Sequence, residues 1–340
     1  MDALVAEVLG AENDLKGPSP DAWFERLDGE RERLDGALAW LLENDHEQGL
    51  CLAGAVWPFW LARGLVADGR DWFARLLAVC DPEQRTAGRA KALYGAGTLA
   101  FIQGDREAAL PLHTESLAIA RELGDRSLEA DALIGLARVA LLDGDSGVME
   151  QQARASLEAA RAGRDQKRSA TALHHVVEAL RRQRRYDEAL PLYHESVAVH
   201  RALGDRRGVA LELHNLGNVA RLMGNNEAAA ERFRESLELA AELKNARLIG
   251  YCLLGLAHVA ADRGEWPRVA RLLGASAAAL TSAGTTLDPD YLSDRERTRS
   301  AAEAALGSAG CVQEVELGAS LGLEAAVREG LSEALPRSPA

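Results

Sequence analysis

The sequence lacks any Gly-Lys-Ser or Gly-Lys-Thr, and therefore any G-x-x-x-x-G-K-[ST] motif. That motif supplies the amides, lysine and hydroxyl that hold nucleotide phosphates and Mg²⁺, so its absence excludes a P-loop ATPase site in this chain. Basic residues are also few, with 39 lysines and arginines against 52 aspartates and glutamates and a net charge of −13. Binding to nucleic acid phosphates needs a basic surface, so we expect no direct contact with nucleic acid.

Cysteines are equally sparse. Cys51, Cys80, Cys252 and Cys311 are widely separated and lack the spacing of metal ligands, which indicates free thiols in a reducing compartment. Residues 1–16 lack the basic and apolar regions of a secretion signal, and no apolar run is long enough to span a bilayer. We therefore expect a cytoplasmic protein without a membrane partner.

The sequence also lacks an H-E-x-x-H motif, although His175, Glu178 and His214 form a conceivable metal-ligand set. Serines recur in the chain, but at small-residue packing positions rather than beside a histidine that would act as a base. We therefore expect no metal, no cofactor and no enzymatic activity.

What the sequence does contain is a forty-residue repeat, clearest from Asp205 to Lys244. One set of positions, forty residues apart, holds serine in all five copies: Ser116, Ser156, Ser196, Ser236 and Ser276. A second set holds glycine and then a short polar or acidic residue, with Arg184-Arg185 as the exception: Gly104-Asp105, Gly144-Asp145, Gly224-Asn225 and Gly264-Glu265. Such pairs are typical of a left-handed helix end followed by a capped helix start.

A second boundary in each copy is marked by Asp125, Asp165, Asp205 and Asn245, with Gly124, Gly163 and Gly204 just before three of them. Each repeat is therefore predicted to hold two helices. Leu213, Leu216-Gly217, Ala220, Ala229 and Phe233 resemble the residues of the tetratricopeptide repeat, and His113, Ala153 and Leu273 occupy the position of Phe233 in other copies. The resemblance implies an all-α fold, a right-handed superhelical solenoid of antiparallel helix pairs with helical caps.

The predicted organisation has five parts: a frayed terminus or linker at 1–20, a helical cap at 21–85, five repeats at 86–284, a second helical cap at 285–335 and a disordered tail at 336–340. Helices are expected near 21–28, 30–44, 46–63 and 67–80. Five of the six tryptophans fall in the first cap, where packing between helices explains them better than ligand stacking.

A further resemblance lies in WLLEND, WPFWLARG and GRDWFARLL, then ESLAIARELGD in the repeats, and LGASLGLEAAVREGL near the end. From about Asp21 to Leu331 these segments resemble the carboxy-terminal sensor region of large bacterial signal-transduction ATPases, related to the LuxR, AfsR and maltose-regulator groups. The resemblance implies a transcriptional regulator whose nucleotide-binding module belongs to the same chain or to a partner chain.

The first helix of each pair lines the concave face in this repeat class, so a binding groove is predicted there. The residues assigned to it are Arg138, His174, His175, Glu178, Arg181, His214, Asn215, Asn218, Arg221, Tyr251 and His258. Amides pair with an extended main chain and guanidinium groups bind carboxylates, which favours a peptide, a protein segment or a small-molecule effector as ligand. The alternative is a structural scaffold that self-associates as a homo-oligomer or docks to an ATPase or transcription-regulator partner.

Overall fold

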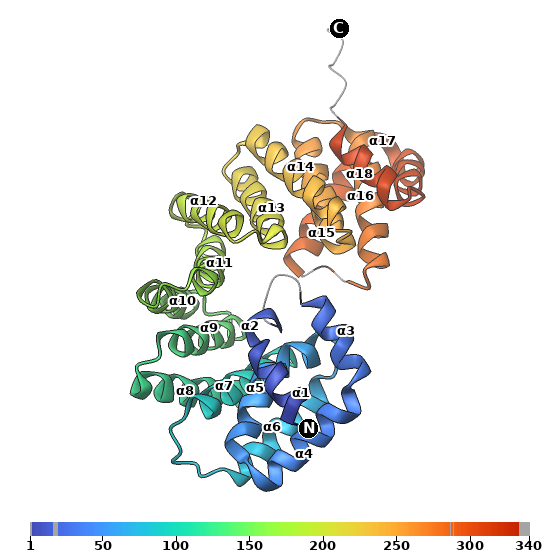
Figure 1. Cartoon of the computed structure of the whole chain (residues 1–340). Helices are drawn as coiled ribbons and strands as arrows, with labels where there is room; N and C mark the ends of the chain where they lie inside the picture. The colour runs from blue at the N-terminus through green and yellow to red at the C-terminus, as the bar shows by residue number, and fades with distance from the viewer. Residues whose placement is uncertain (1, 16–19, 286, 288, 333–340) are drawn as a thin grey trace. The chain divides into compact units, whose positions relative to one another are not determined.

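The computed structural model describes residues 2–15, 20–285, 287 and 289–332. Within these residues the regular elements are all α-helices and no strand is present, which confirms the predicted all-α, tetratricopeptide-like solenoid of helix pairs. The helices belong to two compact units, Met1–Arg185 and Tyr186–Ala340, which are described separately (Figure 1). None of the helices in the described part of the chain is long and apolar enough to cross a membrane.

The first unit begins with a group of short helices and continues with helix pairs. Its elements are α1 (Asp2–Gly10), α2 (Glu12–Leu15), α3 (Asp21–Gly29), α4 (Arg31–Asn44), α5 (His46–Ala62), α6 (Val66–Val79), α7 (Ala87–Ile102), α8 (Arg106–Leu123), α9 (Arg126–Leu142), α10 (Ser146–Ala162) and α11 (Gln166–Arg182). The helices α3 to α6 differ from their predicted bounds by no more than one residue at either end. Of the aromatic side chains here, Phe59, Trp60 and Phe73 are buried in the core, whereas Trp40 is 44% exposed.

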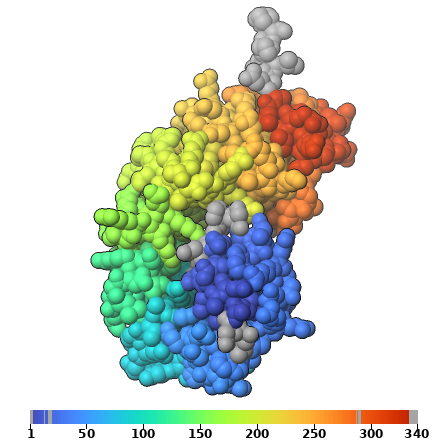
Figure 2. Space-filling model, viewed as in Figure 1, coloured from blue at the N-terminus to red at the C-terminus, as the bar shows by residue number. Residues whose placement is uncertain are grey.

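The expected frayed terminus was wrong for the residues that the structure describes. Leu4, Val5 and Val8 of α1 and Leu15 of α2 are buried in the same core as α5, and Glu12 forms an ion pair of 2.6 Å with Lys91 of α7. Figure 2 shows this segment in dark blue against the rest of the first unit. Residues 16–19 of the predicted linker lie outside the described residues, as does the tail at 336–340.

The second unit contains α12 (Tyr186–Ala202), α13 (Arg206–Leu222), α14 (Asn226–Glu242), α15 (Ala246–Asp262), α16 (Trp266–Ser282), α17 (Pro289–Ala319) and α18 (Leu323–Leu331). Gly307 interrupts α17 with φ 75° and ψ 156°, so this element is two helices joined at a kink. Glycine adopts this backbone conformation without the steric cost that a side chain would add. The kink lies within the segment predicted as the second helical cap, and α17 and α18 pack against α16 (Figures 1 and 2).

The helix starts within the repeats are capped by the predicted short polar residues. A first-turn N–H donates to the side chains of Asp105, Asp125, Asp145, Asp165, Asp205, Asn225 and Asn245. Glu265 was wrongly expected to act in the same way and forms no such cap. Its longer side chain is a poor N-cap, and Pro267 in the first turn has no N–H to donate.

One helix end also differs from the expectation. Gly163 has an ordinary φ of −76°, and Arg164 takes the left-handed conformation with φ 54°. Arg164 stands forty residues after the left-handed Gly124 and forty before Gly204. The forty-residue spacing therefore places the left-handed position, even where the residue there is not glycine.

Four of the five recurrent serines join the two helices of a repeat, Ser196 being the exception. Their hydroxyls donate to backbone carbonyls 26 residues earlier: Ser116 to Ala90 (2.9 Å), Ser156 to Ala130 (2.8 Å), Ser236 to Ala210 (2.6 Å) and Ser276 to Gly250 (2.7 Å). All four serines are buried. A small side chain lets the helices approach closely, and the hydrogen bond satisfies a hydroxyl that burial would otherwise leave unpaired.

Glycines make room for a ring in two of the repeats. His113 on α8 lies against Gly97 and Gly135, and a Cβ added at either glycine would come within 2.7 Å of the imidazole. Phe233 on α14 has glycines at the same sequence offsets, and added Cβ atoms there would come within 2.8 Å of its ring. His113 is therefore a core residue, and burial and the charge of Arg138 lower its pKa to about 3.

Candidate functional site on the first helices of the repeats

The predicted groove residues divide between the two units. Arg138 on α9 and His174, His175, Glu178 and Arg181 on α11 belong to the first unit; the second unit holds His214, Asn215, Asn218 and Arg221 on α13 and Tyr251 and His258 on α15. Two groupings result. We call Tyr94, Arg138 and His175 the Arg138 cluster, and His214, Asn218, Arg221, Tyr251 and His258 the Arg221 cluster.

Arg138 is the centre of the first cluster. Its Nε donates to Nε2 of His175 at 3.4 Å, and its Nη1 donates to the hydroxyl of Tyr94 at 3.5 Å. Both contacts are longer than a well-formed hydrogen bond, and both partners are neutral groups. Arg138 forms no ion pair with any of the described residues, so this half-buried guanidinium has no carboxylate partner among them.

The tautomer of His175 follows from its second contact. Its Nδ1 lies 2.9 Å from the carbonyl of Thr171, which only accepts, so Nδ1 carries the proton and Nε2 faces Arg138 as an acceptor. Burial, followed by the charges of Arg138 and His174, lowers the pKa of His175 well below its ordinary value. The imidazole is therefore neutral, and it orients the guanidinium without neutralising it.

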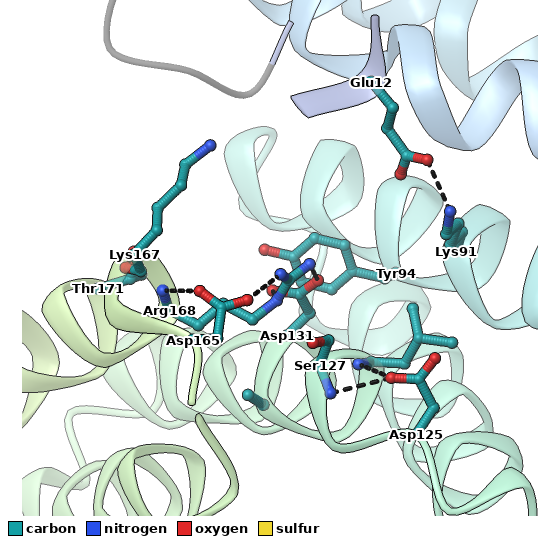
Figure 3. A network of polar contacts seen from close by, with 12 residues as sticks. Glu12, Lys91, Tyr94, Asp125, Ser127, Asp131, Asp165, Lys167, Arg168 and Thr171 are labelled. Atoms are coloured by element: carbon teal, nitrogen blue, oxygen red, sulfur yellow. Dashed lines mark hydrogen bonds and ion pairs between the residues drawn. The ribbon is translucent and has the colours of Figure 1, made fainter. Parts of the chain in front are cut away.

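The neighbouring acidic residue is already occupied. Asp131 on α9 accepts two hydrogen bonds from Arg168 on α11, at 2.9 and 2.7 Å, and Arg168 also binds Asp165 at 2.5 Å (Figure 3). Such a bidentate pair is the strongest geometry for these groups. Asp131 is thus held by Arg168, which leaves Arg138 to face the neutral groups of its cluster.

Glu178 and Arg181 lie one turn further along α11 and bind each other. Arg181 donates to both Glu178 oxygens at 2.8 and 2.7 Å, and Arg182 donates to one of them at 2.7 Å. Burial opposes ionisation of Glu178, but the hydrogen bond and charge of Arg181 hold its pKa below the usual range. This helical trio has one acidic and two basic groups, so it adds positive charge to the face that holds His174 and His175.

In the second unit the predicted residues meet a segment that the sequence did not assign to the site. Asn218 lies 2.9 Å from Nε2 of His214 and donates to the hydroxyl of Tyr291 on α17 at 3.3 Å. The Tyr291 ring stacks on His214 at 6.4 Å between centroids and meets the edge of Tyr251 at 5.1 Å. His214 is 3% exposed, so it contacts a ligand only if the surrounding side chains move.

The cationic end of the Arg221 cluster also faces α17. Nη2 of Arg221 lies 3.4 Å from a carboxylate oxygen of Asp294, while its Nε is buried and has no hydrogen-bond partner within residues 2–15, 20–285, 287 and 289–332. His258 is buried beside this pair, and burial and then the charge of Arg221 lower its pKa to about 4. The cluster therefore contains one guanidinium, two imidazoles, an amide and a phenol. Tyr291 contacts Asn218, His214 and Tyr251, and Asp294 contacts Arg221.

Asn215 is half-buried and forms no hydrogen bond with the described residues, so the structure does not join it to either cluster. Tyr291 and Asp294 are the residues that sequence reasoning missed. An isolated tyrosine in the charged stretch YLSDRERTR was the available signal. A cavity of about 410 Å³ in the second unit, lined by Leu190, His194, Leu216, Ala220, Met223, Asn225, Ala228 and Arg232, contains none of the predicted residues.

The chemistry of these groups is that of binding. Among the described residues, no three His, Cys, Asp or Glu side chains are close enough to hold a metal ion. Cys252 contacts the Ser236 hydroxyl at 3.2 Å, and burial raises the pKa of its thiol to about 12. A thiol with that pKa stays protonated near neutral pH and is a poor nucleophile. Guanidinium, amide and aromatic groups remain, and these recognise carboxylates, main-chain amides and rings.

Comparison with known proteins supports the repeat and the fold. The tetratricopeptide repeat family matches residues 168–242, and comparison of the sequence with curated proteins finds no match. A Rap protein in complex with competence and sporulation factor is 12% identical, with a TM-score of 0.63 over 97% of this chain and 100% of that one.

Two further solved structures share the fold. The apo form of the quorum sensor NprR from B. thuringiensis is 16% identical, with a TM-score of 0.60 over 93% of this chain and 90% of that one. The Rap conjugation gene regulator of the plasmid pLS20, in complex with the Phr* peptide, is 12% identical, with a TM-score of 0.51 over 77% and 76% of the two chains. At these identities the likeness establishes a common fold, and the chain carries tetratricopeptide repeats at 168–242 within that fold.

Proposed function

We propose that this chain is a non-catalytic sensor module of a bacterial regulator, and that it binds a peptide through the first helices of its repeats. The observation that carries the proposal is Arg138, a half-buried guanidinium held by Tyr94 and His175 without a carboxylate partner among the described residues. A carboxylate ligand would replace two long contacts to neutral groups with charge-assisted hydrogen bonds.

The structural comparisons support the peptide as ligand class. One protein of this fold is described in complex with a peptide, and another is described as a quorum sensor. Likeness of fold alone does not transfer a ligand, so the proposal depends on the Arg138 cluster. The peptide beyond its carboxylate is proposed to contact further side chains of α11, the helix that carries His175: His174, Glu178 and Arg181.

The regulator context rests on the sequence resemblance over residues 21–331. We propose that a nucleotide-binding module, in the same chain or in a partner chain, receives the signal of peptide binding. The four free cysteines are consistent with a reducing, cytoplasmic location.

The test uses a library of random hexapeptides with free carboxyl ends, screened against the full chain by fluorescence anisotropy. Arg138→Ala should weaken the binding of the selected peptides about ten- to hundredfold, which is the effect expected for loss of a charged hydrogen bond. Arg33→Ala is the matched control. Arg33 is exposed on α4, and its substitution removes the same charge outside the cluster. Equal binding by Arg138→Ala and wild type would refute the proposal.

A further inference from the structure

The kink at Gly307 divides α17 into halves that are attached in different ways. The half after the kink is anchored: Arg271 on α16 donates to Glu314 at 2.7 Å, and Gly318 lies so close to the Arg271 backbone that an added Cβ would reach 1.9 Å from its carbonyl oxygen. We call the half before the kink, residues 289–306, the strap. Leu287 immediately before the strap is buried in the core, so both ends of the strap are fixed.

The strap covers the Arg221 cluster through two side chains one helical turn apart. Tyr291 accepts a hydrogen bond from Asn218 and packs against His214 and Tyr251, and Asp294 pairs with Arg221. Residues three apart lie on one face of a helix. The strap thus presents an aromatic ring and a carboxylate to the residues that were predicted to bind a ligand.

Little else holds the strap in place. Among residues 291–306 only Thr298 and Ala302 are buried, and the Thr298 hydroxyl donates to the Asp294 carbonyl within the strap itself. Leu292, the larger aliphatic side chain near Tyr291, is 39% exposed. Tyr291 and Leu306 are partly buried against the core, so the strap is attached by two small buried side chains, two partly buried ones and a few polar contacts. A helix with so few buried side chains belongs to the less stable parts of a fold.

The contact between Asp294 and Arg221 is also incomplete. At 3.4 Å it is longer than a charge-assisted hydrogen bond of 2.7–2.9 Å, and Asp294 forms a shorter contact of 2.7 Å with Arg297. The buried Nε of Arg221 has no hydrogen-bond partner in the described part of the chain. A carboxylate from another molecule would satisfy Nε and Nη2 of Arg221 together, which Asp294 does not do here.

We propose that the strap is an internal placeholder, and that the second unit binds an acidic, aromatic peptide segment that displaces it. The inference rests on the proposed function, since it names the ligand chemistry for the second unit. The incoming ring takes the place of Tyr291 between His214 and Tyr251, and the incoming carboxylate binds Arg221. Displacement frees residues 289–306, so the strap becomes exposed to solvent when the peptide is bound.

The first experiment needs no ligand. Hydrogen–deuterium exchange of the full chain compares wild type with Asp294→Asn and with Glu296→Gln, which removes an exposed charge from the same helix. Amides at 291–306 should exchange at least about threefold faster in Asp294→Asn, as expected for loss of a partly exposed ion pair, and stay at the wild-type rate in Glu296→Gln. Unchanged exchange in Asp294→Asn would refute the placeholder.

The second experiment supplies the strap as a separate molecule, a fluorescein-labelled peptide with the sequence of residues 289–303. The double variant Tyr291→Ala with Asp294→Asn keeps the Arg221 cluster intact, because both substitutions lie on the strap. It should bind the peptide at least about tenfold more tightly than wild type, whose tethered strap competes at a high effective concentration. A peptide carrying the same two substitutions should not bind.

The outcomes separate the two proposals. Failure of the double variant to bind the strap peptide more tightly than wild type would overturn the ligand chemistry assigned here. The peptide screen with Arg138→Ala concerns the first unit, so its result leaves the exchange measurement unaffected. Circular dichroism of each variant checks that the repeat helices remain folded.

Discussion

Replacing His113 by phenylalanine should make the protein less sensitive to acid. The unfolded chain binds a proton at this histidine near pH 6.5, whereas burial lowers the folded-state pKa to about 3. Between these values the unfolded state carries the additional proton, so the free energy of unfolding falls as the pH falls below 6.5. From pH 7 to pH 5 the loss due to this one group is about 2 kcal/mol.

Phenylalanine removes that loss because it does not titrate. We expect position 113 to accommodate the phenylalanine ring, because Phe233 lies between glycines at the same sequence offsets. Any packing cost of the substitution is the same at both pH values, so it cancels in the comparison. Buried His258, whose pKa is lowered to about 4, has the same sign of effect but is present in both proteins and also cancels.

Urea unfolding followed by circular dichroism at pH 7 and pH 5 measures the effect in wild type and His113→Phe. The decrease in unfolding free energy between the two pH values should be smaller in the variant by about 2 kcal/mol. His194→Phe is the control, because His194 is exposed on α12. An identical pH dependence for His113→Phe and wild type would show that His113 is not buried as a neutral ring.

Three further predictions concern packing and charge. Ser236→Ala removes the hydrogen bond to the Ala210 carbonyl and should lower stability by about 1 kcal/mol in thermal unfolding. Gly135→Ala should lower it by about 1–3 kcal/mol, because the new methyl group would lie 2.2 Å from the His113 ring, whereas Gly36→Ala has open space and should be neutral or stabilising. Arg168→Lys loses the bidentate pair with Asp131 and should lower the free energy of unfolding more at low salt than at high salt. A destabilisation that is larger at high salt would contradict the last of these.

The repeat helices were predictable because their information is local. Caps such as Asp165 and buried serines such as Ser236 recur every forty residues and act on neighbouring helices of the same repeat. The burial of α1 and α2 was mispredicted for the opposite reason. The apolar pattern of Leu4 and Val8 is visible in the sequence, but the surface that buries it is α5, some forty residues away.

The candidate site was predictable only in part. Spacing placed Arg138 and His175 on adjacent first helices, and the structure brings them into contact. It did not predict that Tyr291 and Asp294 cover His214 and Arg221, because the strap comes from outside the repeats and depends on the path of the chain after α16. Nor did it predict that Arg168 binds Asp131, or that Arg138 has no carboxylate partner among the residues that the structure describes.

Binding of a peptide carboxylate to Arg138 can be observed at the side chain itself, by nitrogen NMR of its guanidinium. The Arg138 Nε–H signal is assigned by its absence in Arg138→Lys and followed while a library-selected peptide is added. This signal should shift when the free-acid peptide is added and stay in place when the amidated form is added. Binding of the free-acid peptide with no change in the Arg138 signal would contradict the proposed binding to Arg138.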